Sequence, residues 1–182
     1  MSVMRRVLSA VAILAGLSVA PTAHAATVTG GSAILSSSDA NQLETWLGEG
    51  PIELTNIFTR QTGNSAAMFH AAVDGMGRTI SVIALDNGNV VGGYNPISWA
   101  GPNGYKTSGD LSAFLFNLTT GEKLEQFRYP QWQTHYRSNY GPTFGGGHDL
   151  HINNALTGGY ANIGHTYETP VGTVAGATGQ NA

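Results

Sequence analysis

The sequence predicts an α+β domain in which helices come first and an antiparallel β-sheet follows. Apolar residues recur at the helical spacing of three and four between residues 37 and 75, whereas from Thr79 onward the period changes to two. Two hairpin turns lie in this second part of the chain. Helices and strands segregated in this way are typical of an α+β plan and not of a doubly wound parallel sheet.

The first helix is expected to begin at Ser37 or Ser38, because a serine hydroxyl can accept a hydrogen bond from a backbone N–H of the first turn. Leu43 and Trp46 then fall on one face, and Gly48 ends the helix.

The second helix is expected to begin at residues 64–65 and to stop at Gly75. Phe69 and Val73 share its apolar face. His70 lies beside that face, where a packing or surface role is favoured over a catalytic one.

Two β-hairpins are predicted after the helices. Residues 79–85 and 90–94 are joined by an Asn-Gly turn, and the β-branched run of the first strand suits a strand covered on both faces. Residues 112–118 and 124–129 form the second hairpin. A short strand at residues 150–152 follows a glycine triplet.

The N-terminus has the three parts of a secretory signal peptide. Arg5 and Arg6 supply the positive charge, residues 7–20 are mostly apolar, and Ala-His-Ala at 23–25 matches the cleavage pattern, so cleavage is expected after Ala25. The apolar run is shorter than the about 20 residues that a membrane span needs. We expect a secreted or periplasmic product with no membrane span after cleavage.

The remaining chain has the size of a single domain, which we place at residues 26–168, followed by a small-residue tail at 169–182 that is expected to be mobile. After Ala25 there are six Lys and Arg residues against all eleven Asp and Glu residues, a net charge of −5. This balance argues against a nucleic acid partner. The absence of cysteine excludes disulfides, thiolate nucleophiles and cysteine-bound zinc.

The segment of residues 145–151, Gly-Gly-Gly-His-Asp-Leu-His, is the first place to look for chemistry. His148, Asp149 and His151 are candidate metal ligands, but a metal site needs three or four convergent ligands. On a strand, only Asp149 and His151 share a face while His148 points the other way. His135 or His165 would have to complete such a site.

A structural interpretation of the same segment is favoured. In it, Asp149 accepts hydrogen bonds from the glycine turn, and the glycines supply positive φ angles and close backbone approach. Ser98 lacks the flanking glycines of a nucleophile elbow and is expected to be structural. A set of aromatic residues can stack on a sugar or fill a core, with packing the favoured use: Tyr94, Trp99, Tyr105, Trp132 and Tyr136.

The order of several motifs along the chain is similar to that of a known domain family. Phe-His-Ala-Ala-Val-Asp-Gly at 69–75 is followed by Val-Gly-Gly-Tyr at 91–94 with Ile-Ser-Trp at 97–99, then by Ala-Phe-Leu-Phe-Asn-Leu at 113–118 and Gly-Pro-Thr-Phe-Gly-Gly-Gly-His-Asp-Leu at 141–150. This succession closely resembles the TLDc domain family.

The resemblance implies a two-sheet antiparallel β-sandwich flanked by helices. It places family motif positions with a structural or binding role on Gly92, Gly93, Tyr94, Ser98, Trp99, Gly145, Gly146, Gly147, His148 and Asp149. It implies no cofactor. Eukaryotic members are linked to oxidative-stress resistance and to the cytosolic sector of the vacuolar proton pump, and an exported protein would not meet that pump sector.

We therefore expect a non-catalytic binding module of the cell exterior, linked to oxidative-stress protection, with a protein or glycan partner that the sequence does not name. One alternative is a metal-assisted hydrolase that uses His148, Asp149 and His151. Another is a structural component of the matrix or envelope.

Overall fold

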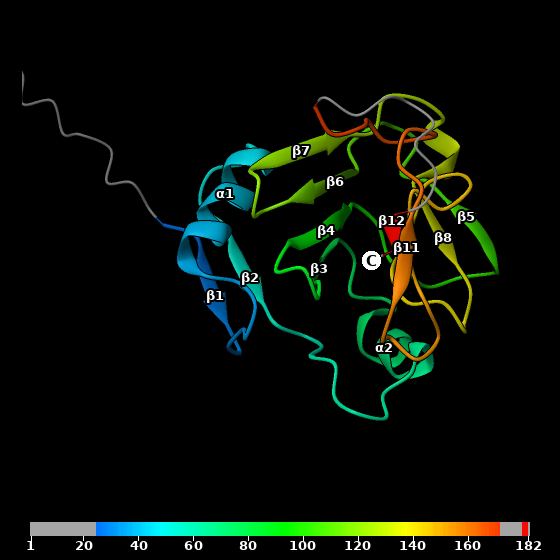
Figure 1. Cartoon of the computed structure of the whole chain (residues 1–182), viewed down its shortest axis with the longest axis horizontal. Coiled ribbons are helices and arrows are strands. Elements are labelled where there is room, and N and C mark those ends of the chain that lie inside the picture. The colour runs from blue at the N-terminus through cyan, green and yellow to red at the C-terminus, as the bar shows by residue number, and fades with distance from the viewer. Residues whose placement is uncertain (1–24, 172–179, 182) are drawn as a thin grey trace, which may run out of the picture.

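The computed structural model describes residues 25–171 and 180–181. The predicted signal peptide up to His24 and most of the predicted tail lie outside the described residues. Two larger β-sheets face each other, and a small two-stranded sheet with helix α1 lies at one end (Figure 1). The predicted α+β class, a two-sheet sandwich flanked by helices, is confirmed.

The first large sheet has four antiparallel strands. In spatial order these are β3 (Thr79–Ala84), β4 (Val90–Asn95), β6 (Phe114–Asn117) and β7 (Glu122–Glu125). Both predicted hairpins are present in it. β3 pairs with β4 from Thr79 opposite Asn95 to Ala84 opposite Val90, and β6 pairs with β7, although β7 spans residues 122–125 and not the predicted 124–129. Although β3 is an edge strand and its residues are mostly half-buried, both of its faces are partly covered: Ile83 packs against the core between the large sheets, and Ile80 and Val82 pack against a second cluster beside α1.

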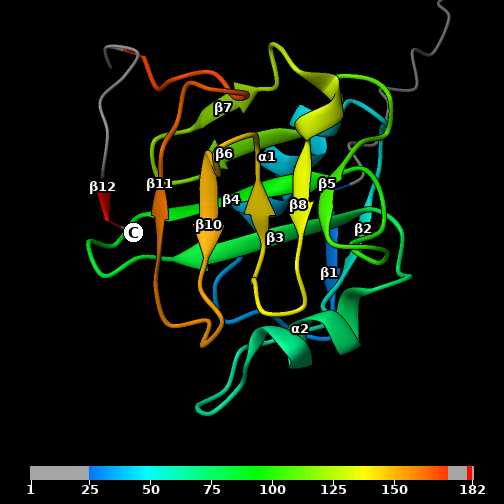
Figure 2. The same ribbon diagram turned by 90° about the vertical axis from the view of Figure 1, so that its right-hand side faces the viewer.

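The second large sheet has six antiparallel strands in the described part of the chain. Their order is β12 (Gln180–Asn181), β11 (Gly159–Ala161), β10 (Leu150–Ile152), β9 (Thr143–Phe144), β8 (Thr134–Tyr136) and β5 (Gly104–Lys106). Figure 2 looks onto its outer face, with its strands crossing in front of those of the four-stranded sheet. A 3-10 turn, η1 (Pro130–Trp132), leads into β8.

The small sheet consists of β1 (Thr27–Thr29) and β2 (Glu53–Thr55), which are parallel and are connected through α1 (Ser37–Leu47). The cap of α1 is Ser36, one residue before the predicted position. The Ser36 hydroxyl accepts from the backbone N–H of Asp39, whose carboxylate accepts in turn from the N–H of Ser36. Gly48 ends the helix with φ of 69°, as expected.

Helix α2 (Ala66–Val73) lies below both sheets (Figures 1 and 2). His70 is buried on it: its Nδ1 lies 2.8 Å from an Asp74 carboxylate oxygen, and its Nε2 lies 3.1 Å and 3.0 Å from the carbonyl oxygens of Arg137 and Tyr140. The packing role expected for His70 is therefore observed, and the ring fastens α2 to the loop after β8.

The main core lies between the two large sheets. Trp99 and Phe144 are fully buried there with edge-on rings 5.4 Å apart, and Leu115 packs against them. Gly93 makes this approach possible, because a Cβ at that position would lie 2.7 Å from a ring carbon of Phe144 and 2.8 Å from a methyl carbon of Leu115. Neither helix in the described part of the chain has the length and apolar character that a membrane crossing requires.

Candidate functional site: an aromatic surface on the six-stranded sheet

The carboxylate of Asp149 is fully buried and holds one loop in place. Its Oδ1 accepts hydrogen bonds from the backbone N–H groups of Gly164 (3.1 Å), His165 (3.0 Å), Thr166 (3.1 Å) and Tyr167 (3.3 Å). Burial raises the pKa of Asp149, and these N–H groups oppose that rise. Asp149 is a structural hydrogen-bond acceptor, as predicted, but its donors are the N–H groups of residues 164–167 and not those of the glycine turn.

The N–H groups of the glycine triplet, residues 145–147, donate to acceptors other than Asp149. Gly145 donates to the carbonyl of Gln133, Gly146 to the hydroxyl of Thr166 at 2.8 Å, and Gly147 to the hydroxyl of Tyr105 at 3.3 Å. The φ angles of Gly145 and Gly147 are 80° and 78°, so the predicted positive φ angles are present.

Close approach requires glycine at two positions of this turn. A Cβ at Gly145 would collide with the carboxylate of Asp149, and a Cβ at Gly146 would collide with the ring of Trp132 and lie 3.1 Å from Cε1 of His165. The turn is therefore pressed between the buried carboxylate on one side and two rings on the other.

His148 and His151 lie together, contrary to the strand-alternation prediction. Their rings are stacked, with centroids 5.2 Å apart and 22° between planes, while Asp149 points into the interior. The prediction fails because β10 begins only at Leu150, and His148 has a φ of 64°, which turns its side chain onto the outer face. Among residues 25–171 and 180–181, no group of three or more histidine, aspartate or glutamate side chains is placed to hold a metal ion.

The register of the sheet aligns more rings with this pair. His151 is opposite Tyr160 across β10 and β11, and His135 is opposite Tyr105 across β8 and β5. The ring centroids lie 5.1 Å apart for His151 and Tyr160, and 4.6 Å apart for His135 and Tyr105. His148 bridges the two pairs, with its centroid 5.1 Å from that of His135.

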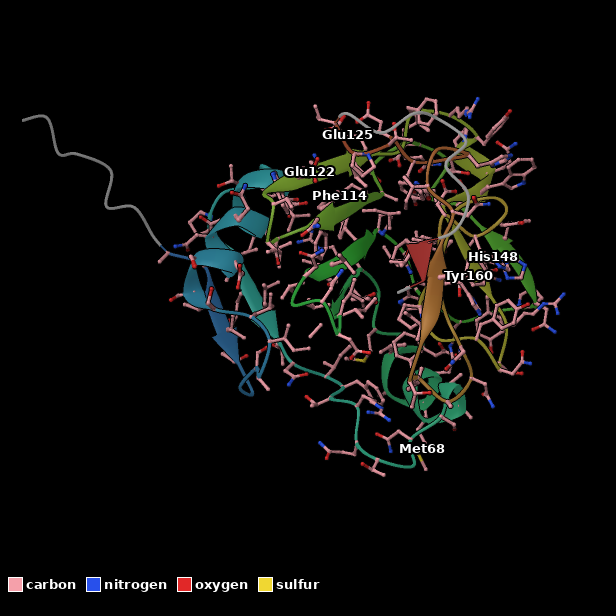
Figure 3. The ribbon with its side chains drawn as sticks, viewed as in Figure 1. Met68, Phe114, Glu122, Glu125, His148 and Tyr160 are labelled. Atoms are coloured by element: carbon pink, nitrogen blue, oxygen red, sulfur yellow. The ribbon has the colours of Figure 1, made fainter. Side chains whose placement is uncertain are left out.

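Hydrogen bonds fix the orientation of these imidazoles. The hydroxyl of Thr143 donates to the carbonyl of Gly141 and lies 2.9 Å from Nδ1 of His151. Because the single hydroxyl proton is already used, His151 must donate from Nδ1, which leaves Nε2 as an acceptor. Nδ1 of His148 lies 2.7 Å from the hydroxyl of Tyr160, and the two side chains lie next to each other beside β11 in Figure 3.

A second group of rings, from the turn before β8 and the loop after β11, continues the surface. His165 stacks on Tyr129 and Trp132 with centroid distances of 5.2 Å and 5.5 Å, and the rings of Tyr129 and Trp132 are tilted with centroids 4.8 Å apart. Trp132 also lies 5.6 Å from Tyr105, which joins the two groups. The guanidinium of Arg128 donates to the carbonyls of His165 and Gly164 and so braces the loop that carries His165.

We call this continuous surface the aromatic face. Its members are rings that contact one another over the outer side of the six-stranded sheet and the loops beside it. They are Tyr105, Tyr129, Trp132, His135, Tyr140, His148, His151, Tyr160 and His165.

The imidazoles at the centre of the aromatic face are held in the neutral form at neutral pH. Burial lowers the pKa of His135 to about 4 and that of His151 to about 4, and repulsion between neighbouring imidazolium charges adds to the effect. Burial also lowers the pKa of His148, and the charge of Arg137 lowers it further.

The other predicted motif positions do not join this surface. Gly92 leaves room for the backbone of β3 and the ring of Phe116 on β6, and Gly93 leaves room for Phe144 of the facing sheet. The indole N–H of Trp99 donates to the hydroxyl of Thr79 inside the core. The hydroxyl of Ser98 accepts from the backbone N–H groups of Gly75 and Ala100, which is the structural role expected for it.

Tyr94 is likewise buried, against Phe114. Tyr136, one of the aromatic residues noted in the sequence, packs on His70, away from the aromatic face.

Sequence reasoning named four members of the aromatic face besides His148 and His151, but it did not bring them together. Tyr105 and Trp132 were noted as aromatic residues of uncertain use, and His135 and His165 as distant metal ligands. Tyr129, Tyr140 and Tyr160 were missed. One signal was available: four of the six histidines fall between residues 135 and 165.

Comparison with family models gives one match, to the model described as TLDc domain, over residues 28–178. The search of curated proteins finds no match.

Proposed function

We propose that this chain, which belongs to the TLDc domain family, is a non-catalytic glycan-binding module whose binding surface is the aromatic face. The observation that carries the proposal is the continuity of the exposed ring array. Tyr105, Tyr129 and Tyr160 are 40%, 36% and 38% exposed although each contacts other rings. Rings that are held in place and still face solvent stack on the C–H faces of sugars with little loss of conformational entropy.

The polar atoms of the aromatic face suit sugar hydroxyl groups. Nε2 of His151 accepts, and the hydroxyls of Tyr105 and Tyr160 lie at the two ends of the row that crosses the sheet. A ligand would therefore find stacking surfaces with hydrogen-bonding partners between them, as small-molecule sites usually provide.

The chemistry of the surface supports binding more than catalysis. Glycoside hydrolysis ordinarily uses two carboxyl groups that flank the scissile bond. The carboxylate next to His148 in the sequence, Asp149, faces the interior and is occupied by four backbone N–H groups. The hydrolase hypothesis, which requires Asp149 to act beside His148 and His151, has no geometric support from this arrangement.

The location of the module at the cell exterior remains part of the proposal and rests on the signal-peptide pattern of residues 1–25. A contribution to oxidative-stress protection would operate through the bound ligand, because a chain without cysteine offers no thiol chemistry.

The test is ligand binding by the purified chain against a panel of neutral and acidic oligosaccharides, measured by isothermal titration calorimetry and by tryptophan fluorescence, to which Trp132 of the aromatic face contributes. Tyr160→Ala is expected to weaken binding about tenfold, the equivalent of about 1.4 kcal/mol for one lost stacking partner. Met68→Ala, on α2 and well away from Tyr160 in Figure 3, is the matched control for an exposed side chain. If no oligosaccharide binds, or if both variants bind as the unmodified chain does, the proposal is wrong.

A further inference from the structure

The aromatic face differs in charge from the rest of the chain. Between residues 126 and 167 the only acidic residue is Asp149, and its carboxylate is buried and turned inward. The same stretch contains Arg128, Arg137 and four of the six histidines. Residues 126–167 therefore contribute no exposed carboxylate to the aromatic face, whereas the other regions of the chain are predominantly acidic.

The two arginines lie at separate places along the ring array. The guanidinium of Arg128 lies 5.3 Å from the ring centroid of Tyr129, and that of Arg137 lies 5.4 Å from the ring centroid of Tyr140. Neither forms a salt bridge with a described residue. A ligand that crosses the aromatic face would therefore find a ring with a positive charge beside it twice, at Tyr129 and at Tyr140.

We propose that the ligand of the aromatic face is an acidic polysaccharide, a chain of pyranose rings that carry carboxylates, and that its binding is coupled to proton uptake by the central histidines. This inference rests on the proposed function and names the ligand class. Pyranose rings stack on Tyr105, Trp132 and Tyr160, and the ligand carboxylates supply the negative charge that the face lacks.

Among the ionisable groups that surround the central imidazoles, the charge of Arg137 favours the neutral form of His135 and His148. Arg137 follows β8, and the phenols of Tyr105, Tyr140 and Tyr160 come from β5, from the loop before β9 and from β11. Asp149 lies behind His148 and is the one group whose charge favours protonation.

A carboxylate delivered by a ligand would reverse this balance. It would stand beside His135, His148 and His151 on the outer side of the sheet, where residues 126–167 expose no carboxylate of their own. A nearby opposite charge raises the pKa of an imidazole. Reciprocal linkage then requires the affinity to increase as the pH falls.

The density of charge distinguishes this ligand from a nucleic acid. Nucleic acid affinity depends on Lys and Arg groups that neutralise a phosphate at each nucleotide, and single-strand binders have a continuous basic groove. Two arginines lie beside the aromatic face, and burial favours the neutral form of its three central imidazoles, His135, His148 and His151. An acidic polysaccharide, with stacking rings and a weaker line of charge, matches that arrangement better.

The experiment compares a charged with an uncharged form of one ligand: an oligogalacturonate and the same oligosaccharide with its carboxylates converted to methyl esters. Affinities of the purified full chain are measured by calorimetry at pH 5 and pH 7.5, in buffers of different ionisation enthalpy so that proton uptake is read directly. Circular dichroism at both pH values confirms that the chain remains folded.

We expect the oligogalacturonate to bind at least tenfold more tightly at pH 5 than at pH 7.5, with uptake of protons, and to bind more tightly than the ester at pH 5. His148→Gln should reduce both the pH dependence and the proton uptake. Arg137→Gln should weaken binding of the acid about tenfold and leave binding of the ester nearly unchanged.

Equal binding of the acid and the ester at both pH values would overturn the inference while the proposed glycan-binding function stands. Absence of binding by either ligand, together with a blank oligosaccharide panel, would overturn both. A single-stranded oligonucleotide that binds more tightly than the oligogalacturonate at pH 5 would also overturn the inference.

Discussion

The two faces of the six-stranded sheet use aromatic residues differently. Phe144 points inward and is fully buried against Trp99 and Tyr167, and the Tyr167 hydroxyl donates to a backbone carbonyl. On the outer face Tyr105 and Tyr160 keep more than a third of their surface exposed. One sheet can therefore separate stability from binding, because successive side chains of a strand point to opposite faces.

Among the variants that test this separation, Phe144→Ala is expected to have the largest effect on stability. The substitution removes a fully buried ring that contacts Trp99 and Tyr167, and it should lower the free energy of unfolding by about 3–5 kcal/mol. Urea denaturation followed by far-ultraviolet circular dichroism measures the change. A loss below about 1 kcal/mol would show that the inner face does not carry the stability assigned to it here.

Asp149→Ala tests the support beneath the aromatic face. The substitution leaves the backbone N–H groups of residues 164–167 without their acceptor, and each unsatisfied buried group is costly, so we expect a loss of about 2–4 kcal/mol. Hydrogen exchange should show the largest loss of protection in this loop. Asp149→Asn, which retains one acceptor oxygen, is the control and should cost less.

A decrease in pH should lower the stability of the chain through the histidines of the outer face. His135 and His151 have pKa values of about 4 in the folded chain and 6.5 in the unfolded chain, so the unfolded chain binds more protons between these values. Stability should therefore fall as the pH decreases from about 6.5 to about 4, on the order of 2 kcal/mol after solvent screening of the half-exposed His151. His151→Gln should flatten this part of the stability curve. An unchanged slope would contradict the assignment.

Tyr160→Ala should have the smallest effect on stability, below about 1 kcal/mol, because the ring is partly exposed and lies near the edge of the sheet. The same substitution is expected to weaken ligand binding. Thermal unfolding and calorimetry on one preparation would measure both quantities. A large loss of stability would mean that the two faces are not separated in the way proposed.

Local signals made much of the fold predictable. The Asn-Gly turn and the β-branched run before it fixed the first hairpin, and the glycine at position 48 fixed the end of α1. The six-stranded sheet was harder to predict, since several of its strands have two or three residues, too few to show a period. The position of His148 was predicted wrongly for a related reason: a single φ of 64° interrupts the alternation that sequence reasoning assumes.

The sequence by itself determined the class of the fold, the hairpins and the concentration of histidines after residue 134, because these depend on neighbours along the chain. Only the tertiary structure decided that Tyr105 stands opposite His135 and that His151 stands opposite Tyr160. Cross-strand register joins residues that can be far apart in sequence, and it is set by the packing of the whole sheet. For the same reason the buried direction of Asp149, which separates it from the histidines beside it, became visible only in the folded chain.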